Sequence, residues 1–151
     1  MEAENLEFRE ALEILGKRAG IEITDKRIVP RDRSLYDIME TACLFYQRSL
    51  HSDRGEMAHK YLSKRSMTIE QASVFELGWA SPGWDSLWKN LKGHGVSYKD
   101  ALECGLVLEG KHGPYDRFRG RLMFPIRNIM GKLIAFGGRL VDGNGAKYIN
   151  N

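Results

Sequence analysis

The chain contains the stretch Arg117-Phe118-Arg119-Gly120-Arg121-Leu122-Met123-Phe124-Pro125-Ile126-Arg127, in which arginines alternate with mostly apolar side chains. Because successive side chains of a strand point to opposite faces, the stretch predicts a strand with one packed, apolar face. The other face would present Arg117, Arg119, Arg121 and Arg127. A guanidinium stays charged at every working pH, and its planar donors match phosphate oxygens. The pattern therefore favours contact with a polyanion.

The arginine row is also compatible with a solvated strand face, because strands often expose charge to protect an edge. Lysine is the usual residue for that purpose, however, and neighbouring like charges repel unless an anion lies between them. Residues 111–151 carry eight Lys and Arg against two Asp, whereas residues 1–110 carry 15 basic against 18 acidic side chains. This uneven distribution indicates nucleic acid or nucleotide phosphates as the partner.

The first two thirds of the chain predict helices. Residues 1–20 form the first predicted helix and residues 21–33, which are charged and contain Pro30, a linker. Further helices are expected after the capping residues Ser34, Thr68, Asp85 and Ser97, and over 56–64. The aromatic residues Phe75, Trp79, Trp84 and Trp88 are expected in the core.

After Gly105 the pattern changes to short apolar runs separated by turn residues. The runs are 106–108, the arginine stretch, 132–136 followed by Gly137-Gly138-Arg139, and 147–149. The sequence thus predicts an α+β fold, in which a mainly helical part (34–105) precedes a small, basic antiparallel sheet (106–151).

Several classes of protein are excluded by composition. No apolar run approaches the roughly 18 residues of a membrane helix, and the first residues do not resemble a signal peptide, so we expect a cytoplasmic protein. Cys43 and Cys104 stand apart, without the spacing of a zinc site, and are expected to be buried. No glycine-rich nucleotide-binding motif is present.

Three shorter motifs leave alternatives open. The two glycines of 136–139 allow either a close approach to an anion or a tight bend. Tyr148 is suited either to stacking on a base or to ordinary packing. Lys64-Arg65 suits either phosphate binding or the end of a helix.

Residues 115–127 resemble a signature stretch of bacterial DNA primases, the DnaG family. The resemblance continues in order through four further stretches, 61–65, 78–85, 131–139 and 146–150. It implies the N-terminal subdomain of the RNA-polymerase catalytic core, in a larger protein that adds a zinc ribbon before it and a Toprim subdomain after it. Ser66 and Gly120 depart from the usual family residues, outside the expected contacts.

The resemblance also implies roles for individual residues. Template and phosphate contacts are expected from Arg65, Arg117, Arg119, Arg121, Arg127 and Arg139. Proximity to the nucleotide and the active centre is expected of Lys147, Tyr148 and Asn150. Neither a metal site nor a catalytic residue is expected in this chain, because Mg²⁺ or Mn²⁺ would bind the Toprim subdomain and Zn²⁺ the ribbon.

The expected function is that of part of a DNA primase, a nucleotidyltransferase that makes RNA primers for DNA replication. Its partners would be single-stranded DNA template, nucleoside triphosphates, the RNA primer and, through other regions, the replicative helicase. The chain alone is expected to be inactive and to act in the cytoplasm, at the nucleoid, without a membrane. The alternatives are a non-catalytic module that binds single-stranded DNA, and a small enzyme that binds a phosphorylated metabolite at 136–139.

Overall fold

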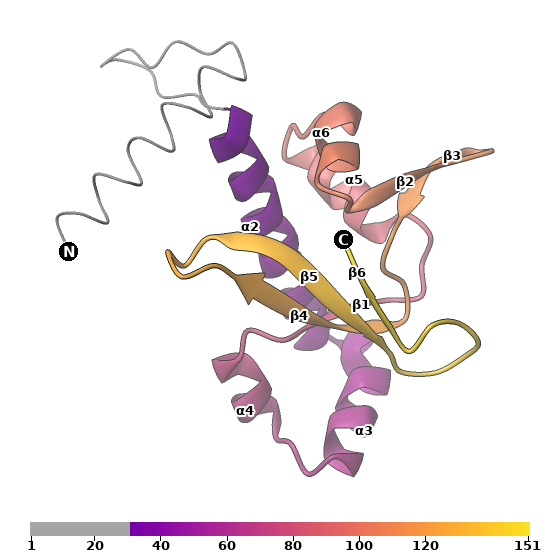
Figure 1. The fold of residues 1–151 in the computed structure, drawn as a ribbon. Coiled ribbons are helices and arrows are strands. Elements are labelled where there is room, and N and C mark those ends of the chain that lie inside the picture. Colours follow the sequence, from indigo (N-terminus) through magenta and orange to yellow (C-terminus); the bar gives the residue numbers. More distant parts are fainter. Residues whose placement is uncertain (1–30) are drawn as a thin grey trace, which may run out of the picture. The chain divides into compact units, whose positions relative to one another are not determined.

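The computed structural model describes residues 31–151, with side chains from Leu35 onward. The predicted helix over 1–20 and the first part of the predicted linker lie outside the described residues. The chain divides into two compact units, Met1–Leu35 and Tyr36–Asn151. The structure below concerns the second unit, together with the start of its first helix (Figure 1).

The helical part contains one long helix and several short ones. None of the helices in the described residues is long and apolar enough to cross a membrane. The elements of the helical part, in chain order, are α2 (Arg31–Leu50), the 3₁₀ turn η1 (Asp53–Gly55), α3 (Glu56–Lys64), α4 (Ile69–Val74), α5 (Ser86–Gly93) and α6 (Tyr98–Glu103).

Local capping by a side chain sets the starts of two of these helices, α4 and α6. The Thr68 hydroxyl accepts from the Gln71 N–H while the Gln71 side chain accepts from the Thr68 N–H, which confirms the predicted capping box of α4. At α6 the Ser97 hydroxyl accepts from the Asp100 N–H, which caps the helix from one side only. In contrast, α2 begins at Arg31 and not after the predicted cap Ser34. Residues 31–33 contain neither proline nor glycine, so the helix extends back to the residue that follows Pro30.

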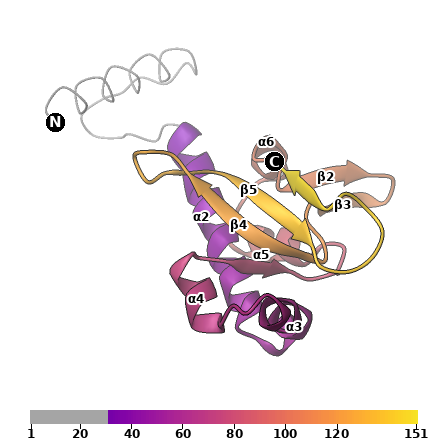
Figure 2. The same ribbon diagram turned by 60° about the horizontal axis from the view of Figure 1, so that its bottom comes forward.

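The strands form a four-stranded antiparallel sheet in the order β1-β4-β5-β6 and a separate β2–β3 hairpin (Figure 2). This arrangement, after a helical half, confirms the predicted α+β fold. Two strands were not predicted: β1, because its Gly-Trp-Ala sequence is too short to show alternation, and β3, because its Gly-Pro-Tyr-Asp sequence begins with two residues typical of turns. The strands are β1 (Gly78–Ala80), β2 (Val107–Gly110), β3 (Gly113–Asp116), β4 (Arg121–Arg127), β5 (Leu133–Leu140) and β6 (Tyr148–Asn150).

The predicted arginine strand is shorter than its alternation indicates. Strand β4 begins only at Arg121, and the chain from Arg117 to Gly120 crosses from the hairpin to the sheet without strand pairing. Gly120 has a φ of 63°, a left-handed conformation that glycine adopts without the strain of a side chain. The single face of four arginines predicted from the sequence is therefore wrong.

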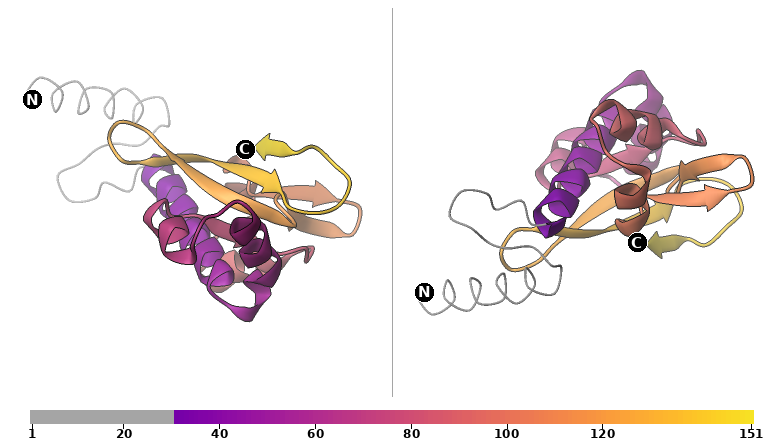
Figure 3. Two further views of the ribbon diagram at one scale, coloured as in Figure 1. Left: turned by 90° about the horizontal axis from the view of Figure 1, so that it is seen from below. Right: turned by 90° about the horizontal axis from the view of Figure 1, so that it is seen from above.

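The sheet packs on both faces. On one, Trp79 and Leu122 join a core cluster with Leu62 of α3 and Ala72 of α4. On the other, the Phe136 ring makes edge contacts with Tyr46 of α2 and with Phe118. In both views of Figure 3, the indigo to magenta helices α2, α3 and α4 gather away from the yellow strand β6, which forms one edge of the sheet.

Gly138 is required by this second face. A Cβ added there would lie 2.8 Å from the Phe118 ring and 3.0 Å from the Arg121 side chain. The glycine therefore lets Phe118 and Arg121 pack directly on β5. The side chains of Phe118 and Arg121 occupy the space beside Gly138 that an anion would need. The close approach that the sequence indicated is therefore made at Gly138 by these two side chains.

The start of α5 is held by a residue from the other end of the subdomain. The N–H groups of Leu87 and Trp88 donate to the two carboxylate oxygens of Asp116, at 2.8 and 3.0 Å. Asp85, which was predicted to cap this helix, precedes it but makes no side-chain cap bond. Asp116 is 3% exposed, and its burial raises the pKa of the carboxyl to about 6 despite the two N–H donors.

We predict that Asp116 makes the fold less stable as pH rises from about 4 to about 6. The folded state binds the proton more tightly than the unfolded state, so this contribution is full below the unfolded pKa of 3.8 and is lost through the folded pKa of about 6. The free energy of unfolding of the wild type relative to Asp116→Asn should fall by about 2–3 kcal/mol over this range. Urea titrations of both proteins at several pH values measure this difference. A difference that stays constant or rises with pH would contradict the prediction.

Candidate functional site

The candidate site is centred on residues 116–120, and backbone hydrogen bonds hold this segment at both ends. The Asp116 N–H donates to the Trp84 carbonyl at 2.7 Å, and the Arg117 N–H donates to the Leu106 carbonyl at 3.0 Å. At the other end of the segment, the Val141 N–H donates to the Gly120 carbonyl at 3.2 Å. These backbone hydrogen bonds place Arg117 and Arg119, which are separated by one residue, beside the sheet.

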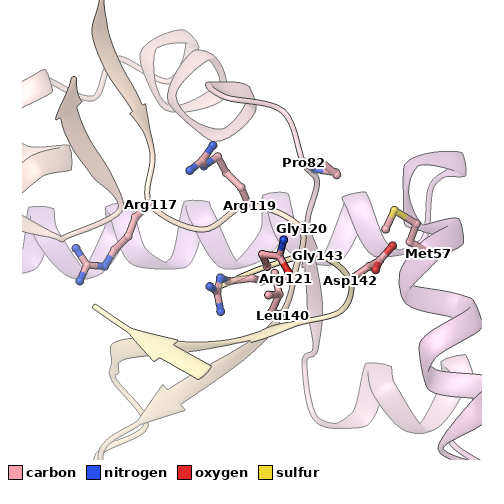
Figure 4. A pocket seen from close by; sticks show the side chains of 10 residues that line it. Met57, Pro82, Arg117, Arg119, Gly120, Arg121, Leu140, Asp142 and Gly143 are labelled. Atoms are coloured by element: carbon pink, nitrogen blue, oxygen red, sulfur yellow. The ribbon is translucent and has the colours of Figure 1, made fainter. Parts of the chain in front are cut away.

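A pocket with a volume of about 370 Å³ opens beside this segment. Arg117, Arg119 and Arg121 line it, and Met57 of α3 and the residues after β5 complete it (Figure 4). Asp142 is the only carboxylate among the lining residues. The excess of guanidiniums makes the pocket electropositive and suited to phosphate groups.

Arg119 is held by an aromatic side chain. Its guanidinium carbon lies 3.9 Å from the centre of the Trp84 ring and 5.6 Å from that of Tyr115. Its Nε is buried without a hydrogen-bond partner. Stacking fixes the guanidinium in place, and its charge partly offsets the rise that burial causes in the pKa of the neighbouring Asp116 carboxyl.

Trp84 was predicted to lie in the core, but its side chain is 64% exposed. Phe75 is equally exposed, whereas Trp79 and Trp88 are buried as predicted. Trp84 follows the turn Ser81-Pro82-Gly83, which carries it out of the helical packing. That turn was the available signal, since aromatic residues next to proline and glycine lie outside the helical repeat that fills a core.

Arg121 is the most buried of these arginines, with 8% of its surface exposed. Its Nη1 donates to the carbonyls of Gly138 at 3.2 Å and Ala146 at 2.9 Å, and it lies 3.5 Å from that of Lys147. Burial and the neighbouring Arg119 lower the pKa of its guanidinium. Arg121 thus holds β5 to the segment before β6, and its charge is balanced by carbonyl dipoles alone in these contacts.

A second cluster gathers three of the other predicted residues near one tyrosine. The guanidiniums of Arg65 and Arg139 lie 5.2 and 5.9 Å from the centre of the Tyr61 ring, and Arg139 Nε donates to the Tyr61 hydroxyl at 3.2 Å. Arg139 also lies 5.0 Å from the ring centre of Tyr148, its partner across the β5–β6 pair. Tyr148 is 68% exposed, which excludes its alternative role in the core.

Two further predicted residues, Lys147 and Asn150, lie along the β6 edge. Lys147 and Asn150 are exposed. The Lys147 carbonyl accepts from the Leu140 N–H at 2.7 Å, and the Asn150 carbonyl accepts from Arg117 Nη2 at 3.3 Å. These bonds use backbone atoms, so both side chains remain available to a ligand. The same edge therefore connects the arginine pocket to the tyrosine cluster.

Arg127 differs from the other arginines because two carboxylates bind it. Its Nε lies 2.9 Å from Glu76, and its Nη1 lies 2.6 Å from Glu40 of α2. These partners raise the pKa of Arg127. The guanidinium joins β4 to α2 and to the residues before β1, and its charge is already neutralised.

We predict that Arg127 stabilises the fold. Arg127→Gln would leave Glu40 and Glu76 facing each other without a cation, and should lower the free energy of unfolding by about 1–2 kcal/mol. Lys60→Gln is the matched control, because the Lys60–Glu56 pair is more than 70% exposed on both sides and should contribute less than about 0.5 kcal/mol. Urea denaturation compares the two variants. Equal losses would contradict the structural role of Arg127.

In the described part of the chain, no three His, Cys, Asp or Glu residues lie close enough together to hold a metal ion. Of the cysteines, Cys43 is buried as predicted, but Cys104 is only half-buried. Burial raises the pKa of the Cys104 thiol to about 12, which makes it a poor nucleophile. The sequence did not indicate Tyr61, Trp84 or Tyr115 as site residues, because their role depends on the arginines that fold onto them.

Comparison with known proteins gives a consistent result. Residues 45–151 match the family described as the DNA primase catalytic core, N-terminal domain. The chain is 41% identical over its full length to a DNA primase of Pseudomonas aeruginosa, and 42% identical over 97% of its length to one of Deinococcus radiodurans. It spans about a quarter of the length of these relatives, 24% and 25% respectively.

Two solved structures are similar in fold and sequence. The RNA polymerase domain of the Mycobacterium tuberculosis primase DnaG matches 78% of this chain and 39% of its own, with a TM-score of 0.74 and 39% identity. A DnaG primase catalytic domain bound to single-stranded DNA matches 80% of this chain and 39% of its own, with a TM-score of 0.71 and 37% identity.

Proposed function

This chain belongs to the DNA primase family, as the N-terminal domain of the catalytic core, and on that premise we propose that it binds the template strand and nucleotide phosphates during the synthesis of RNA primers. The observation that carries the proposal is the arginine pocket, in which Arg117, Arg119 and Arg121 meet one carboxylate. A related catalytic domain was solved with single-stranded DNA, which supports template as the ligand.

Arginines 117 and 119 are the proposed direct phosphate contacts. Within residues 35–151, neither arginine forms a hydrogen bond or salt bridge with a carboxylate, and stacking on Trp84 holds Arg119 in place. Arg121 lies at the pocket wall with its donors on backbone carbonyls. We assign it to shaping the pocket and adding positive potential. Arg127, already paired with Glu40 and Glu76, is proposed to act only through the fold.

The tyrosine cluster and the β6 edge are the proposed nucleotide side of the domain. Arg65 and Arg139 both offer guanidiniums near Tyr61, and Lys147, Tyr148 and Asn150 are exposed along the β6 edge, where Tyr148 contacts Arg139. Cations, an aromatic ring and an amide together can bind the triphosphate and base of a nucleotide.

The nucleotidyl transfer itself would need metal-binding groups that residues 35–151 do not bring together. Two metal ions commonly stabilise the attacking and leaving oxygens in such reactions, and we propose that acidic residues of a Toprim part bind Mg²⁺ or Mn²⁺. A zinc ribbon would bind Zn²⁺. The full primase would act in the cytoplasm, at the nucleoid, together with the replicative helicase.

We predict that the chain binds single-stranded DNA weakly and in a salt-dependent way. With about three guanidiniums acting on the phosphates, Arg117 and Arg119 directly and Arg121 through its charge, log affinity should fall with log salt at a slope near −2, since each adds about −0.7. Fluorescence anisotropy of a labelled oligonucleotide from about 50 to 200 mM salt measures the slope. A flat dependence would mean that the arginines form a solvated surface and bind no template.

Arg119→Gln should weaken this binding and reduce the slope by about 0.7, because one phosphate contact is lost. Arg127→Gln is the matched control, since its charge is neutralised within the fold; it should leave both affinity and slope unchanged once folding is complete. The same anisotropy titrations compare the two variants. Equal losses of affinity would place the template elsewhere on the surface.

This chain alone should make no primers with template, nucleotides and Mg²⁺, because its described residues lack a metal-binding cluster. It should nevertheless bind a nucleoside triphosphate in the presence of DNA, and Lys147→Ala should reduce that affinity while leaving template affinity largely intact. Calorimetric titration measures both affinities. A chain that binds DNA but no nucleotide would instead fit a single-strand-binding module.

A further inference from the structure

We propose that Asn151 is a positioning residue for nucleotide binding, because its side chain fixes strand β6 so that Tyr148 and Asn150 face the nucleotide. This inference rests on the proposed function, since it needs a nucleotide at the β6 edge. It goes further by giving a role in nucleotide binding to a residue whose own side chain points into the subdomain and away from that ligand.

The Asn151 side chain connects β6 to three other parts of the subdomain. Its Oδ1 accepts from the N–H of Phe136 in β5 at 2.7 Å. Its Nδ2 donates to the carbonyl of Cys104, just after α6, at 2.7 Å, and lies 3.9 Å from the sulfur of Met39 in α2. An amide offers an acceptor and a donor in one group. One side chain thus ties the end of β6 to β5, α2 and α6, and Figure 2 shows this end of the chain beside α6.

These bonds continue the pairing of β5 with β6 past the last residue of the strand. The last strand pair joins Gly137 to Asn150. Beyond it, the Asn151 N–H donates to the Phe136 carbonyl at 3.4 Å, and the Asn151 side chain accepts from the Phe136 N–H. The side chain therefore closes the ladder where β6 ends, at the position where an edge strand would otherwise separate most easily.

A glycine leaves room for this anchor. Gly105, which follows the Cys104 acceptor, has a φ of 68°. A Cβ added to Gly105 would lie 3.1 Å from the Cβ of Asn151. Any other residue would be strained in this left-handed conformation and would press on the asparagine. The segment after α6 and the end of β6 therefore fit each other closely.

The anchor also sets which side chains of β6 face the ligand. Successive side chains of a strand point to opposite faces. Because Asn151 points toward Met39 of α2, Asn150 and Tyr148 point to the other face, where Tyr148 lies 5.0 Å from the Arg139 guanidinium. A strand that slipped by one residue would turn both side chains away from Arg139. Asn151 is thus the residue that holds this register at the end of β6.

The test measures the nucleotide KM of primer synthesis and the template affinity of a full primase that carries this domain. Asn151→Ala should raise the nucleotide KM about 3-fold to 10-fold, because apparent affinity falls with the fraction of molecules that hold β6 in place. Template affinity and its salt slope should keep their wild-type values, since the side chain removed is uncharged and does not line the arginine pocket.

Asn128→Ala is the matched control for a general loss of stability. The Asn128 Oδ1 accepts from the N–H groups of Met130 and Lys132 at 2.9 and 3.0 Å, in the hairpin between β4 and β5. Its removal therefore costs the same sheet a comparable set of hydrogen bonds, at a place far along the chain from β6. This variant should keep the wild-type nucleotide KM.

A double-mutant cycle tests whether Asn151 acts through its neighbour. Asn150→Ala alone should raise the nucleotide KM, because the proposed nucleotide contact is lost. In that background Asn151→Ala should raise KM by a smaller factor than it does in the wild type, since less of the contact remains to be positioned.

The outcomes separate this inference from the proposed function. If Asn150→Ala raises the nucleotide KM and Asn151→Ala does not, the β6 edge binds nucleotide and the positioning role is wrong. Equal increases for Asn151→Ala and Asn128→Ala, or equal effects of Asn151→Ala in both backgrounds, would also overturn it. If Asn150→Ala and Lys147→Ala both leave KM unchanged, the proposed nucleotide side itself fails.

Discussion

The buried carboxylate of Asp116 is the constraint on which the site depends. It accepts from the first N–H groups of α5, and the backbone N–H of the same residue donates to Trp84. Because a buried carboxylate is costly without such donors, this position allows little movement of the chain. The three bonds fix residues 116–119 against residues 84–88, and that brings the Arg119 guanidinium onto the Trp84 ring.

The arginines of this chain look alike in sequence and differ in what surrounds them. Arg127 sits between two carboxylates and acts as a cross-link between β4 and α2. Arg121 is buried against backbone carbonyls and holds the segment before β6. Arg119 and Arg139 are held by aromatic rings, which leave much of a cation's attraction for an anion in place. Neutralisation by the fold therefore sorts the arginines into structural and binding groups.

Aromatic side chains perform the second half of this arrangement. Each of the two basic groups is built around exposed or half-exposed rings, Trp84 with Tyr115 and Tyr61 with Tyr148. Stacked rings reduce the freedom of long arginine side chains, so less conformational entropy is lost when a phosphate binds.

The sequence alone determined the α+β fold, the capped helices α4 and α6 and the basic character of the last quarter, because these follow from periodicity, local capping and composition. Its long motifs also identified the primase family. Only the tertiary structure decided which arginines are free, since the carboxylates on Arg127 come from residues 40 and 76 and the ring under Arg119 from residue 84. Alternation in 117–127 could not show that Gly120 interrupts the strand. Contacts between residues far apart in the chain leave no local pattern, and at this site those contacts determine the charge that a ligand meets.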